Sequence, residues 1–479
     1  MKIAFGTEGW RAIIAQEFTM DNVALVTQAI ADHFRASGRR GSAPTVAVGY
    51  DTRFLSDRFA QVVAEVLAGN GIRVRLADRF VPTCAVSRYV VAHRLTCGVM
   101  ITASHNPAAY NGIKIKEAFG GSATTETVAS VERHLGRHPA KRVALEQATR
   151  QGLVDSVNML PDFLNGIRRF INLAAIRRSG LRVLVDPMHG AGGRLIEQLV
   201  AGGPANSRAG KRCTVRTLHA NPDPLFGGQA PEPIASHLTE LSRALARGRW
   251  SLGLATDGDA DRLGVLGPDG AFIPPGQILC VVLDYLLTVR HWKGAVVKTI
   301  SNTSMINRFA HDRGLILHEV PVGFKHIAKL MIEDHVLIGG EESGGIGVQG
   351  YLPERDGILM GLLVLEAMAV QGQGMKQMLR RLERRYGRWH YGRNDLHVPM
   401  ERVQQFFDRV SARPPSAMAG IDVAEVKRLD GIKLIGRDES WLLFRRSGTE
   451  PIVRVYAESL AASRVARLLA FGETLIQTA

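Results

Sequence analysis

Cysteine is scarce in this chain, and its few copies are scattered. Four cysteines (Cys84, Cys97, Cys213 and Cys280) are spread over 479 residues, with no CxxC pair and no Cys/His cluster. This distribution argues against a structural zinc site and against a disulfide framework. Aromatic residues are also few, at 6%, whereas 46% hydrophobic and 22% charged residues are typical of a globular protein with several cores.

Long apolar runs are missing as well. The most apolar stretch, GILMGLLVLEAMAV at residues 357–370, is too short to span a bilayer and contains Glu366, so we predict a buried helix there. The first residues, MKIAFGTEGWRAII, place Gly, Glu, Trp and Arg where a secretory signal needs an unbroken apolar core. We therefore expect a cytoplasmic protein that does not cross a membrane.

Acidic residues are fewer than basic ones, 45 against 60, which gives a formal net charge of +15. A basic surface can attract nucleic acid or other polyanions. Here the arginines are scattered over helix-like segments such as RRLERRYGRWHYGR, and no RNA-binding signature, zinc finger or aromatic–basic alternation accompanies them. We expect no nucleic-acid partner, and a small anionic substrate fits the charge equally well.

The order of strand-like and helix-like segments predicts the fold class. TVAVGY, IRVRL and GVMIT alternate with helical patterns, one of which carries Val23, Val26, Ile30 and Phe34 on a single face. Such alternation is typical of mostly parallel sheets with helices on both faces. It returns twice, and the last part has short strands with one or two helices. We predict three related α/β domains with mostly parallel mixed sheets (1–140, 151–267 and 268–375) and a smaller C-terminal α+β domain (385–479), surrounding a central cleft.

The loop TDGDADR carries the strongest sign of an inorganic ligand. Asp257, Asp259 and Asp261 alternate after a strand, so the loop can direct three carboxylates at one hard cation such as Mg²⁺ or Ca²⁺. An EF-hand is excluded, because its sixth position needs Gly and its twelfth needs Glu, and these are Arg262 and Pro268. A solvated acidic turn is the alternative, but three apposed carboxylates repel one another unless a cation joins them.

Three further polar loops follow strands, where α/β proteins commonly bind ligands. FRRSGTEP offers hydroxyls, backbone N–H groups and an arginine that could hold a phosphate, and GGEESGG offers carboxylates and a serine that could bind vicinal hydroxyls. In TASHNPAAYNGIK, Ser104 could act as a nucleophile, with His105 and Lys114 handling protons nearby. Taken singly, FRRSGTEP and GGEESGG are equally compatible with an ordinary turn, and a lone serine such as Ser104 is usually only a turn residue.

Together the four loops resemble those of the α-D-phosphohexomutase superfamily, which includes phosphoglucomutase and phosphomannomutase. TASHNP resembles the phosphoserine loop, DGDADR the metal loop, GEESGG the sugar-binding loop and RRSGTEP the phosphate-binding loop, in the family's order and over nearly the whole chain. The opening FGTEGWR resembles the family's first segment, whose arginine, here Arg11, faces the active site.

The resemblance implies a Mg²⁺-dependent mutase that exchanges hexose 1-phosphate and hexose 6-phosphate through a hexose 1,6-bisphosphate. It implies that Ser104 carries the phosphoryl group and coordinates Mg²⁺ with the three aspartates, that Lys114 accepts the proton of the sugar hydroxyl, and that Arg262 and His105 assist. The implied substrate ligands are Arg11, Lys325, Glu341, Ser343, Arg445, Ser447, Gly448 and Thr449.

Two departures from the family pattern bear on these roles. Phe324 stands where many members have a histidine, which leaves the role of Lys325 a guess, and Gly345 replaces another histidine after the sugar loop. Glu342 resembles glucose-preferring members, so we predict glucose as the sugar. The alternatives are a phosphomannomutase or a dual-specificity enzyme, then a phosphoglucosamine mutase, a Mg²⁺-dependent sugar phosphatase, and a polyanion-binding protein. We expect a small phosphosugar as the partner, and a monomer or a homodimer.

Overall fold

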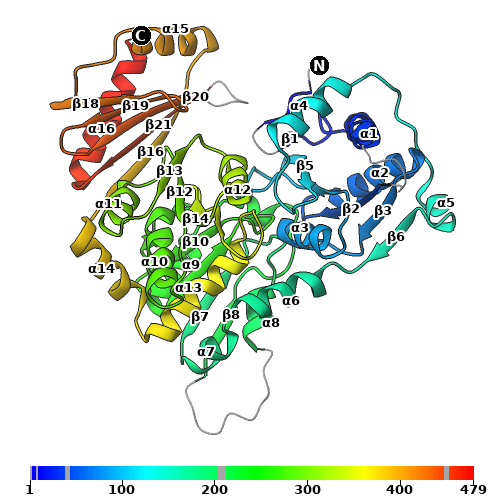
Figure 1. Cartoon of the computed structure of the whole chain (residues 1–479), viewed down its shortest axis with the longest axis horizontal. Coiled ribbons are helices and arrows are strands. Elements are labelled where there is room, and N and C mark those ends of the chain that lie inside the picture. Colours follow the sequence, from blue (N-terminus) through cyan, green and yellow to red (C-terminus); the bar gives the residue numbers. More distant parts are fainter. Residues whose placement is uncertain (1–2, 7–8, 38–43, 202–211, 447–451, 479) are drawn as a thin grey trace.

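The computed structural model describes residues 3–6, 9–37, 44–201, 212–446 and 452–478. Four sheets follow one another along the chain, and Figure 1 shows the N-terminal sheet at the right, two sheets in the middle and the C-terminal sheet at the upper left. The predicted fold class is confirmed, with three α/β domains that have mixed sheets and a β-rich C-terminal domain.

The first sheet combines parallel central strands with two antiparallel strands at one edge. Its order is β1-β5-β4-β2-β3-β6, with β1 and β5 antiparallel to their neighbours and the others parallel. The helix predicted from Val23, Val26, Ile30 and Phe34 is present as α1, and all four side chains are buried. The elements are β1 (Trp10–Ile13), α1 (Met20–Ser37), β2 (Thr45–Tyr50), α2 (Ser56–Gly69), β3 (Arg73–Ala77), α3 (Thr83–Ala92), β4 (Cys97–Ile101), β5 (Tyr110–Glu117), α4 (Thr125–His134), α5 (Leu145–Arg150) and β6 (Val154–Val157).

The second sheet has the order β11-β10-β9-β7-β8, in which β9, β7 and β8 are parallel. Its last two strands in sequence, β10 and β11, are antiparallel to their neighbours. The elements of this part are α6 (Leu160–Phe170), α7 (Leu173–Arg178), β7 (Arg182–Asp186), α8 (Leu195–Ala201), β8 (Thr214–Thr217), the short 3₁₀ helix η1 (Phe226–Gly228), α9 (Thr239–Arg247), β9 (Leu252–Thr256), β10 (Leu263–Leu266) and β11 (Phe272–Ile273).

The third sheet is smaller and has the order β13-β12-β14-β15. β13, β12 and β14 are parallel, and β15 returns antiparallel to β14. Its elements are α10 (Pro275–Thr288), β12 (Ala295–Thr299), α11 (Ser304–Asp312), β13 (Leu317–Val320), α12 (Phe324–Glu333), β14 (Val336–Gly340), β15 (Ile346–Val348), α13 (Gly357–Gln371) and α14 (Met375–Tyr386).

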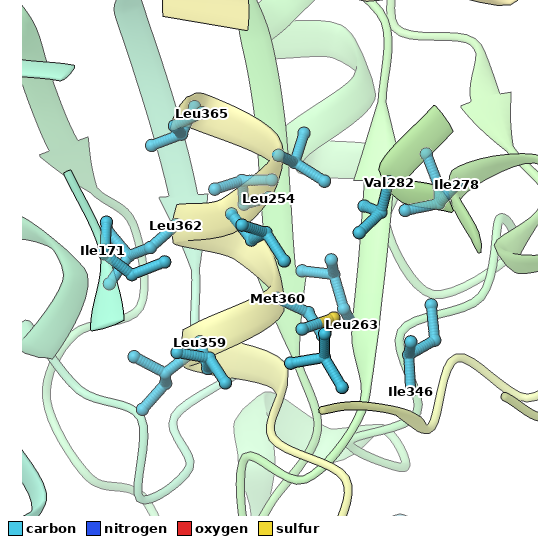
Figure 2. Packing of buried hydrophobic residues seen from close by; sticks show 14 of the residues in the cluster. Ile171, Leu254, Leu263, Ile278, Val282, Ile346, Leu359, Met360, Leu362 and Leu365 are labelled. Carbon is cyan, nitrogen blue, oxygen red and sulfur yellow. The ribbon is translucent and has the colours of Figure 1, made fainter. Parts of the chain in front are cut away.

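Helix α13 is the buried helix predicted from the most apolar stretch of the chain. Apolar side chains from the second and third parts of the fold surround it, and Figure 2 shows Leu254 and Leu263 close to its turns, with Val282 farther out. It therefore belongs to the largest hydrophobic core. Among the described residues, no single helix has the length and apolarity that a membrane crossing requires. Only the bent pair α13 and α14, with 86° between them, meets that measure of length and composition together.

The C-terminal sheet is antiparallel throughout, with the order β16-β21-β20-β19-β18-β17. Phe406, Phe444 and Leu468 lie in its own hydrophobic core, formed between the sheet and its helices. The elements are β16 (His390–His397), α15 (Met400–Ala412), β17 (Ala417–Met418), β18 (Ile421–Lys427), β19 (Ile432–Gly436), β20 (Trp441–Arg446), β21 (Ile452–Ser459) and α16 (Ala462–Gln477).

Two short strands each belong to a sheet whose predicted domain range does not include them. β6 pairs with β3 of the first sheet, and β11 pairs with β10 of the second. The polar loops considered above follow β4, β9, β14 and β20, and the first three of them leave strands whose every residue is buried. Buried strands thus lead into the first three of these loops, which contribute to the site described next.

Candidate active site

Ser104 lies in a buried loop that follows β4. Its φ is 54°, in the left-handed region that residues other than glycine rarely occupy. Its hydroxyl donates a 2.7 Å hydrogen bond to Asp257 Oδ2, and His105 Nδ1 lies 3.4 Å from the same oxygen of Ser104. The serine of the first domain therefore meets the acidic loop of the second.

The three aspartates form one compact, fully buried cluster after β9. Asp257, Asp259 and Asp261 each offer a carboxylate oxygen, and these oxygens lie within 4.8 Å of one another. The loop is folded by Asp257, whose Oδ1 accepts hydrogen bonds from the main-chain N–H groups of Asp261 (2.9 Å) and Arg262 (3.1 Å). Its other oxygen is turned toward Ser104.

The unused oxygens of this cluster fit a cation. Asp259 Oδ1 and Asp261 Oδ1 are buried, and neither has a hydrogen-bond partner among the described residues. A buried charged acceptor without a hydrogen-bond partner destabilises the folded protein, so a bound ligand at these two oxygens would be stabilising. Carboxylate oxygens are the ligands that hard divalent cations prefer. The residues present thus fit a Mg²⁺-type site.

Basic side chains hold the outer oxygens of the cluster. Lys114 Nζ donates to Asp259 Oδ2 (2.7 Å) and Asp261 Oδ2 (2.8 Å), and Arg355 Nη2 donates to Asp261 Oδ2 (2.8 Å). Thr83 Oγ1 donates to Asp259 Oδ2 at 2.5 Å. The protein therefore occupies the outer oxygens of Asp259 and Asp261 and leaves their inner oxygens to a ligand.

Charge is balanced unevenly across the aspartates. Burial and repulsion by Asp261 and Asp259 raise the pKa of Asp257 well above its ordinary value. Burial also opposes ionisation of Asp261, but Arg355, Lys114 and Arg262 outweigh it and hold the pKa of Asp261 well below its ordinary value. Of Asp257 and Asp261, the carboxylate nearest Ser104 is therefore the one whose ionised form a cation would stabilise more.

A glycine allows the acidic loop to approach the serine loop. A Cβ at Gly258 would lie 2.5 Å from the main-chain oxygen of Ser104, closer than real Cβ contacts come. Gly258 is thus the residue that lets the two backbones touch. This contact places Asp257 within hydrogen-bond reach of the serine hydroxyl.

Arg355 connects the acidic loop to the sugar-loop sequence GGEESGG. Its Nη1 donates to Glu341 Oε2 at 2.7 Å, while its Nη2 holds Asp261. Glu342 points to different partners, since its Oε2 accepts hydrogen bonds from Ser301 Oγ (2.6 Å) and Thr299 Oγ1 (3.0 Å). Ser343, in the same loop, is half-buried.

Two arginines flank the serine loop. Arg11, on β1, donates from Nη1 to Asn106 Oδ1 at 2.8 Å. Arg262 Nη1 lies 3.6 Å from Glu232 Oε1. Burial, with added repulsion by Arg262 and Arg11, lowers the pKa of His105 well below its ordinary value, so the imidazole is neutral near pH 7.

Arg445 and Lys325 belong to a second group of residues. Arg445 Nε donates to Asp430 Oδ2 at 2.7 Å, and the same oxygen accepts the main-chain N–H of Val322 at 2.9 Å. Lys325 is half-buried in the first turn of α12, three residues beyond Val322. Within the described part of the chain, no contact joins Arg445 or Lys325 to the aspartate cluster. Ser447, Gly448 and Thr449 lie outside the described residues.

Several residues of this site were not predicted from the sequence. Arg355 links two loops, Thr83 and Asp430 hold predicted residues, and Asp51 and Arg53 support the serine loop from beneath. A signal existed for the last pair, because the polar residues Asp51 to Arg53 directly follow β2, and α/β proteins bind ligands at the carboxyl ends of parallel strands. Arg355 could have been suspected as a charged residue two positions before an apolar helix.

Models of one protein family match three parts of this chain. Residues 2–141, 161–270 and 274–386 match the models of the phosphoglucomutase/phosphomannomutase family for its alpha/beta/alpha domains I, II and III, respectively. A phosphoglucosamine/phosphogalactosamine mutase of Sulfurisphaera tokodaii is 29% identical over 95% of both chains.

Two further proteins extend the likeness to other sugar names. A phosphoglucomutase/phosphomannomutase of Thermococcus kodakarensis is 28% identical over 99% of this chain and 98% of its own. A solved structure described as a candidate phosphomannomutase of Thermus thermophilus superposes with a TM-score of 0.86 at 33% identity, covering 100% of this chain and 99% of that one.

Proposed function

Because the chain belongs to the phosphoglucomutase/phosphomannomutase family, a family of intramolecular phosphotransferases, we propose that it interconverts glucose 1-phosphate and glucose 6-phosphate. The family predicted from the four motifs is thereby confirmed. The relatives differ in the sugar that their names carry, so the choice of glucose is ours and has its own support below.

One observation carries the proposal. Ser104 presents its hydroxyl to Asp257 at the edge of a buried carboxylate cluster whose inner oxygens have no partner among the described residues. A serine that donates a phosphoryl group needs charge neutralisation beside it, and phosphoryl transfer depends mainly on positioning and electrostatic stabilisation. We assign Ser104 as the phosphoryl carrier.

Asp257, Asp259 and Asp261 would hold Mg²⁺ together with the phosphorylated Ser104. When bound, such an ion neutralises charge that develops on the transferring phosphoryl group. Lys114 and Arg355 keep the outer carboxylate oxygens in place, so that the inner oxygens face one point. Arg262 follows directly on this loop and would add positive charge beside the donor phosphate.

The transfer itself exchanges one phosphorus–oxygen bond for another. The bond to Ser104 Oγ breaks as a bond to the free hydroxyl of the hexose phosphate forms, and the proton of that hydroxyl passes to a base. His105 Nδ1 lies 3.4 Å from Ser104 Oγ, the oxygen that leaves, so it can orient that oxygen, and its neutral imidazole is our candidate for the base where the hexose hydroxyl lies within its reach. Lys114 was predicted for this role, but its ammonium is engaged by two carboxylates, which suits positioning better.

The product of this half-reaction is a hexose 1,6-bisphosphate, which would turn and return its other phosphate to Ser104. Glu341 and Ser343 are our candidates for holding the sugar hydroxyls during both orientations. Arg445, with Ser447, Gly448 and Thr449, would hold the phosphate that does not react, and Arg11 and Lys325 would add positive charge at the substrate. Arg445 already donates to the carboxylate of Asp430, so a phosphate would compete with Asp430 for the guanidinium.

Two sugars are the leading candidates for the substrate. Glu342, which resembles the residue of glucose-preferring members, is fixed by Thr299 and Ser301 and supports glucose. The similarity to a phosphoglucosamine/phosphogalactosamine mutase favours an amino sugar as the second candidate. The two differ at C2, where a hydroxyl is replaced by an ammonium group.

The test is ³¹P NMR of the purified protein with Mg²⁺ and a trace of glucose 1,6-bisphosphate. Glucose, mannose and glucosamine 1-phosphates are supplied in parallel. We expect the 1-phosphate signal to be replaced by a 6-phosphate signal fastest for glucose. A faster reaction with glucosamine or mannose phosphate would overturn the choice of sugar, and release of inorganic phosphate without isomerisation would overturn the mutase.

A further inference from the structure

Arg53 lies buried beneath the serine loop and binds four of its main-chain carbonyls. Nη1 donates to the oxygens of Pro107 (2.8 Å) and Tyr110 (3.0 Å), and Nη2 donates to those of Ser104 and Asn106, both at 2.6 Å. The side chain is fully buried. A single guanidinium therefore fixes the loop from the serine to the start of β5.

The loop is also held on the side that precedes the serine. Asp51 lies 3.3 Å from Arg53 Nε, and its Oδ2 accepts the hydroxyl of Thr102 at 2.6 Å. That hydroxyl oxygen in turn accepts the main-chain N–H of Ser104 at 2.8 Å. Ser56 donates to the other oxygen of Asp51 at 2.9 Å. The Asp51–Arg53 pair thus grips the loop before and after Ser104.

The conformation that this grip maintains is an unfavourable one. A left-handed backbone at a residue other than glycine is strained and persists only where its surroundings enforce it. Ser104 has such a backbone, and its hydroxyl meets Asp257 from that position. The second domain packs against Arg53, since the Phe226 ring centroid lies 4.8 Å from Arg53 Cζ.

We propose that Arg53 is a positioning residue that holds Ser104 where its phosphoryl group meets the three aspartates. Arg53 acts through the loop backbone, because its buried guanidinium donates to four main-chain carbonyls. The chemistry requires arginine, because its planar fork presents several donors in fixed directions, whereas a lysine ammonium presents three from one point. This inference rests on the proposed function, since it assigns Arg53 a part in the transfer by Ser104.

The first experiment compares Arg53→Lys with Arg290→Lys, a matched control. Arg290 also binds a main-chain carbonyl, that of Phe170 (2.9 Å), and a buried carboxylate, Glu366, but it does so in the main core. We expect Arg53→Lys to lower kcat by about 100-fold, as for a displacement of about 1 Å at the reacting group, with KM unchanged. Arg290→Lys should keep both constants. A wild-type kcat in Arg53→Lys would overturn the inference.

The second measurement does not depend on turnover. Amide hydrogen exchange of residues 102–112, followed by mass spectrometry, should become faster in Arg53→Lys and stay at the wild-type rate in Arg290→Lys. Wild-type exchange in Arg53→Lys would refute the grip on the loop. If the wild-type protein isomerised no sugar phosphate, the proposed function would fail, while this comparison would still decide whether Arg53 fixes the loop.

A second pair of variants covers the case in which Arg53→Lys does not fold. Thr102→Val removes the hydroxyl that joins Asp51 to Ser104 N–H, and Thr102→Ser retains it. We expect a lowered kcat and faster loop exchange in Thr102→Val, and recovery of both in Thr102→Ser. Equal activity in the two variants would contradict the proposed grip.

Discussion

Gly258→Ala tests the contact between the serine loop and the acidic loop. The added Cβ would lie 2.5 Å from the Ser104 carbonyl oxygen, and contacts under 3.0 Å are essentially never seen for real Cβ atoms, so one backbone must move by at least about 0.5 Å. Overpacking of this kind costs about 1–3 kcal/mol. The φ of Gly258 is not in the left-handed region, so the methyl group is the whole perturbation.

The same displacement has a catalytic consequence. If about 1 Å of misplacement costs about 100-fold, then half of it costs about 10-fold in kcat. The hydrogen bond from Ser104 to Asp257, 2.7 Å long, is the contact that should lengthen. We would measure kcat for glucose 1-phosphate with a coupled assay that detects glucose 6-phosphate, at saturating Mg²⁺.

The control is Gly374→Ala, at a glycine with open space around it and a φ of −73°. It should leave kcat and stability at wild-type values. If Gly258→Ala also kept its full kcat, the two loops would not be in the close contact that the site requires, and the placement of Ser104 beside the aspartates would be refuted.

Three other changes address separate parts of the molecule. Asp259→Asn should abolish activation by Mg²⁺ and the stabilisation of the fold by added Mg²⁺, and a thermal shift equal to that of the wild type would reject the metal site. Arg445→Ala should raise KM for hexose phosphates by more than it lowers kcat, and an unchanged KM would move the phosphate site elsewhere. Burial, with repulsion by Lys298, lowers the pKa of Lys433 to about 7 from an ordinary 10.5. Between pH 7 and 10.5 the unfolded chain therefore binds more protons at this residue than the folded chain does, so the free energy of unfolding should rise with pH across that range. Lys433→Met should make that rise less steep in urea titrations at a series of pH values. An equally steep rise in that variant would contradict the assignment.

The main elements of the fold could be predicted because local patterns express them. The helix face of α1, the strand TVAVGY and the apolar helix α13 each have a periodicity or composition that tertiary contacts then reinforce. The strands β6 and β11 were not predicted as members of their sheets. A strand of two or four residues carries little pattern of its own, and only the neighbour it pairs with defines it.

In the candidate site, too, the residues with a local sequence signal could be predicted and those that act at a distance could not. The three aspartates and Ser104 stand in short loops after buried strands, so their chemistry was visible in consecutive residues. Arg355 and Arg53 act over long sequence separations, on Asp261 and on the serine loop. The sequence around each arginine does not indicate which distant group it binds, because that depends on how the domains pack.

The choice between proton roles also needed the structure. Sequence reasoning assigned proton acceptance to Lys114 on the expectation that nearby cations would lower its pKa. Its ammonium instead contacts two carboxylates, Asp259 and Asp261, while His105 is the group kept neutral by burial and by Arg262 and Arg11. These contacts lead us to propose His105 for the role, and they depend on how the domains pack, which the sequence alone does not state.

The central claim is that Ser104 carries the phosphoryl group, and one measurement tests it most directly. The protein is incubated with glucose 1,6-bisphosphate and Mg²⁺, quenched in acid, digested and mapped by mass spectrometry, alongside Ser104→Ala. The account predicts one added phosphoryl group on the peptide that contains Ser104, none in the variant, and loss of isomerase activity with it. Phosphorylation at another residue, or full activity in Ser104→Ala, would contradict the account.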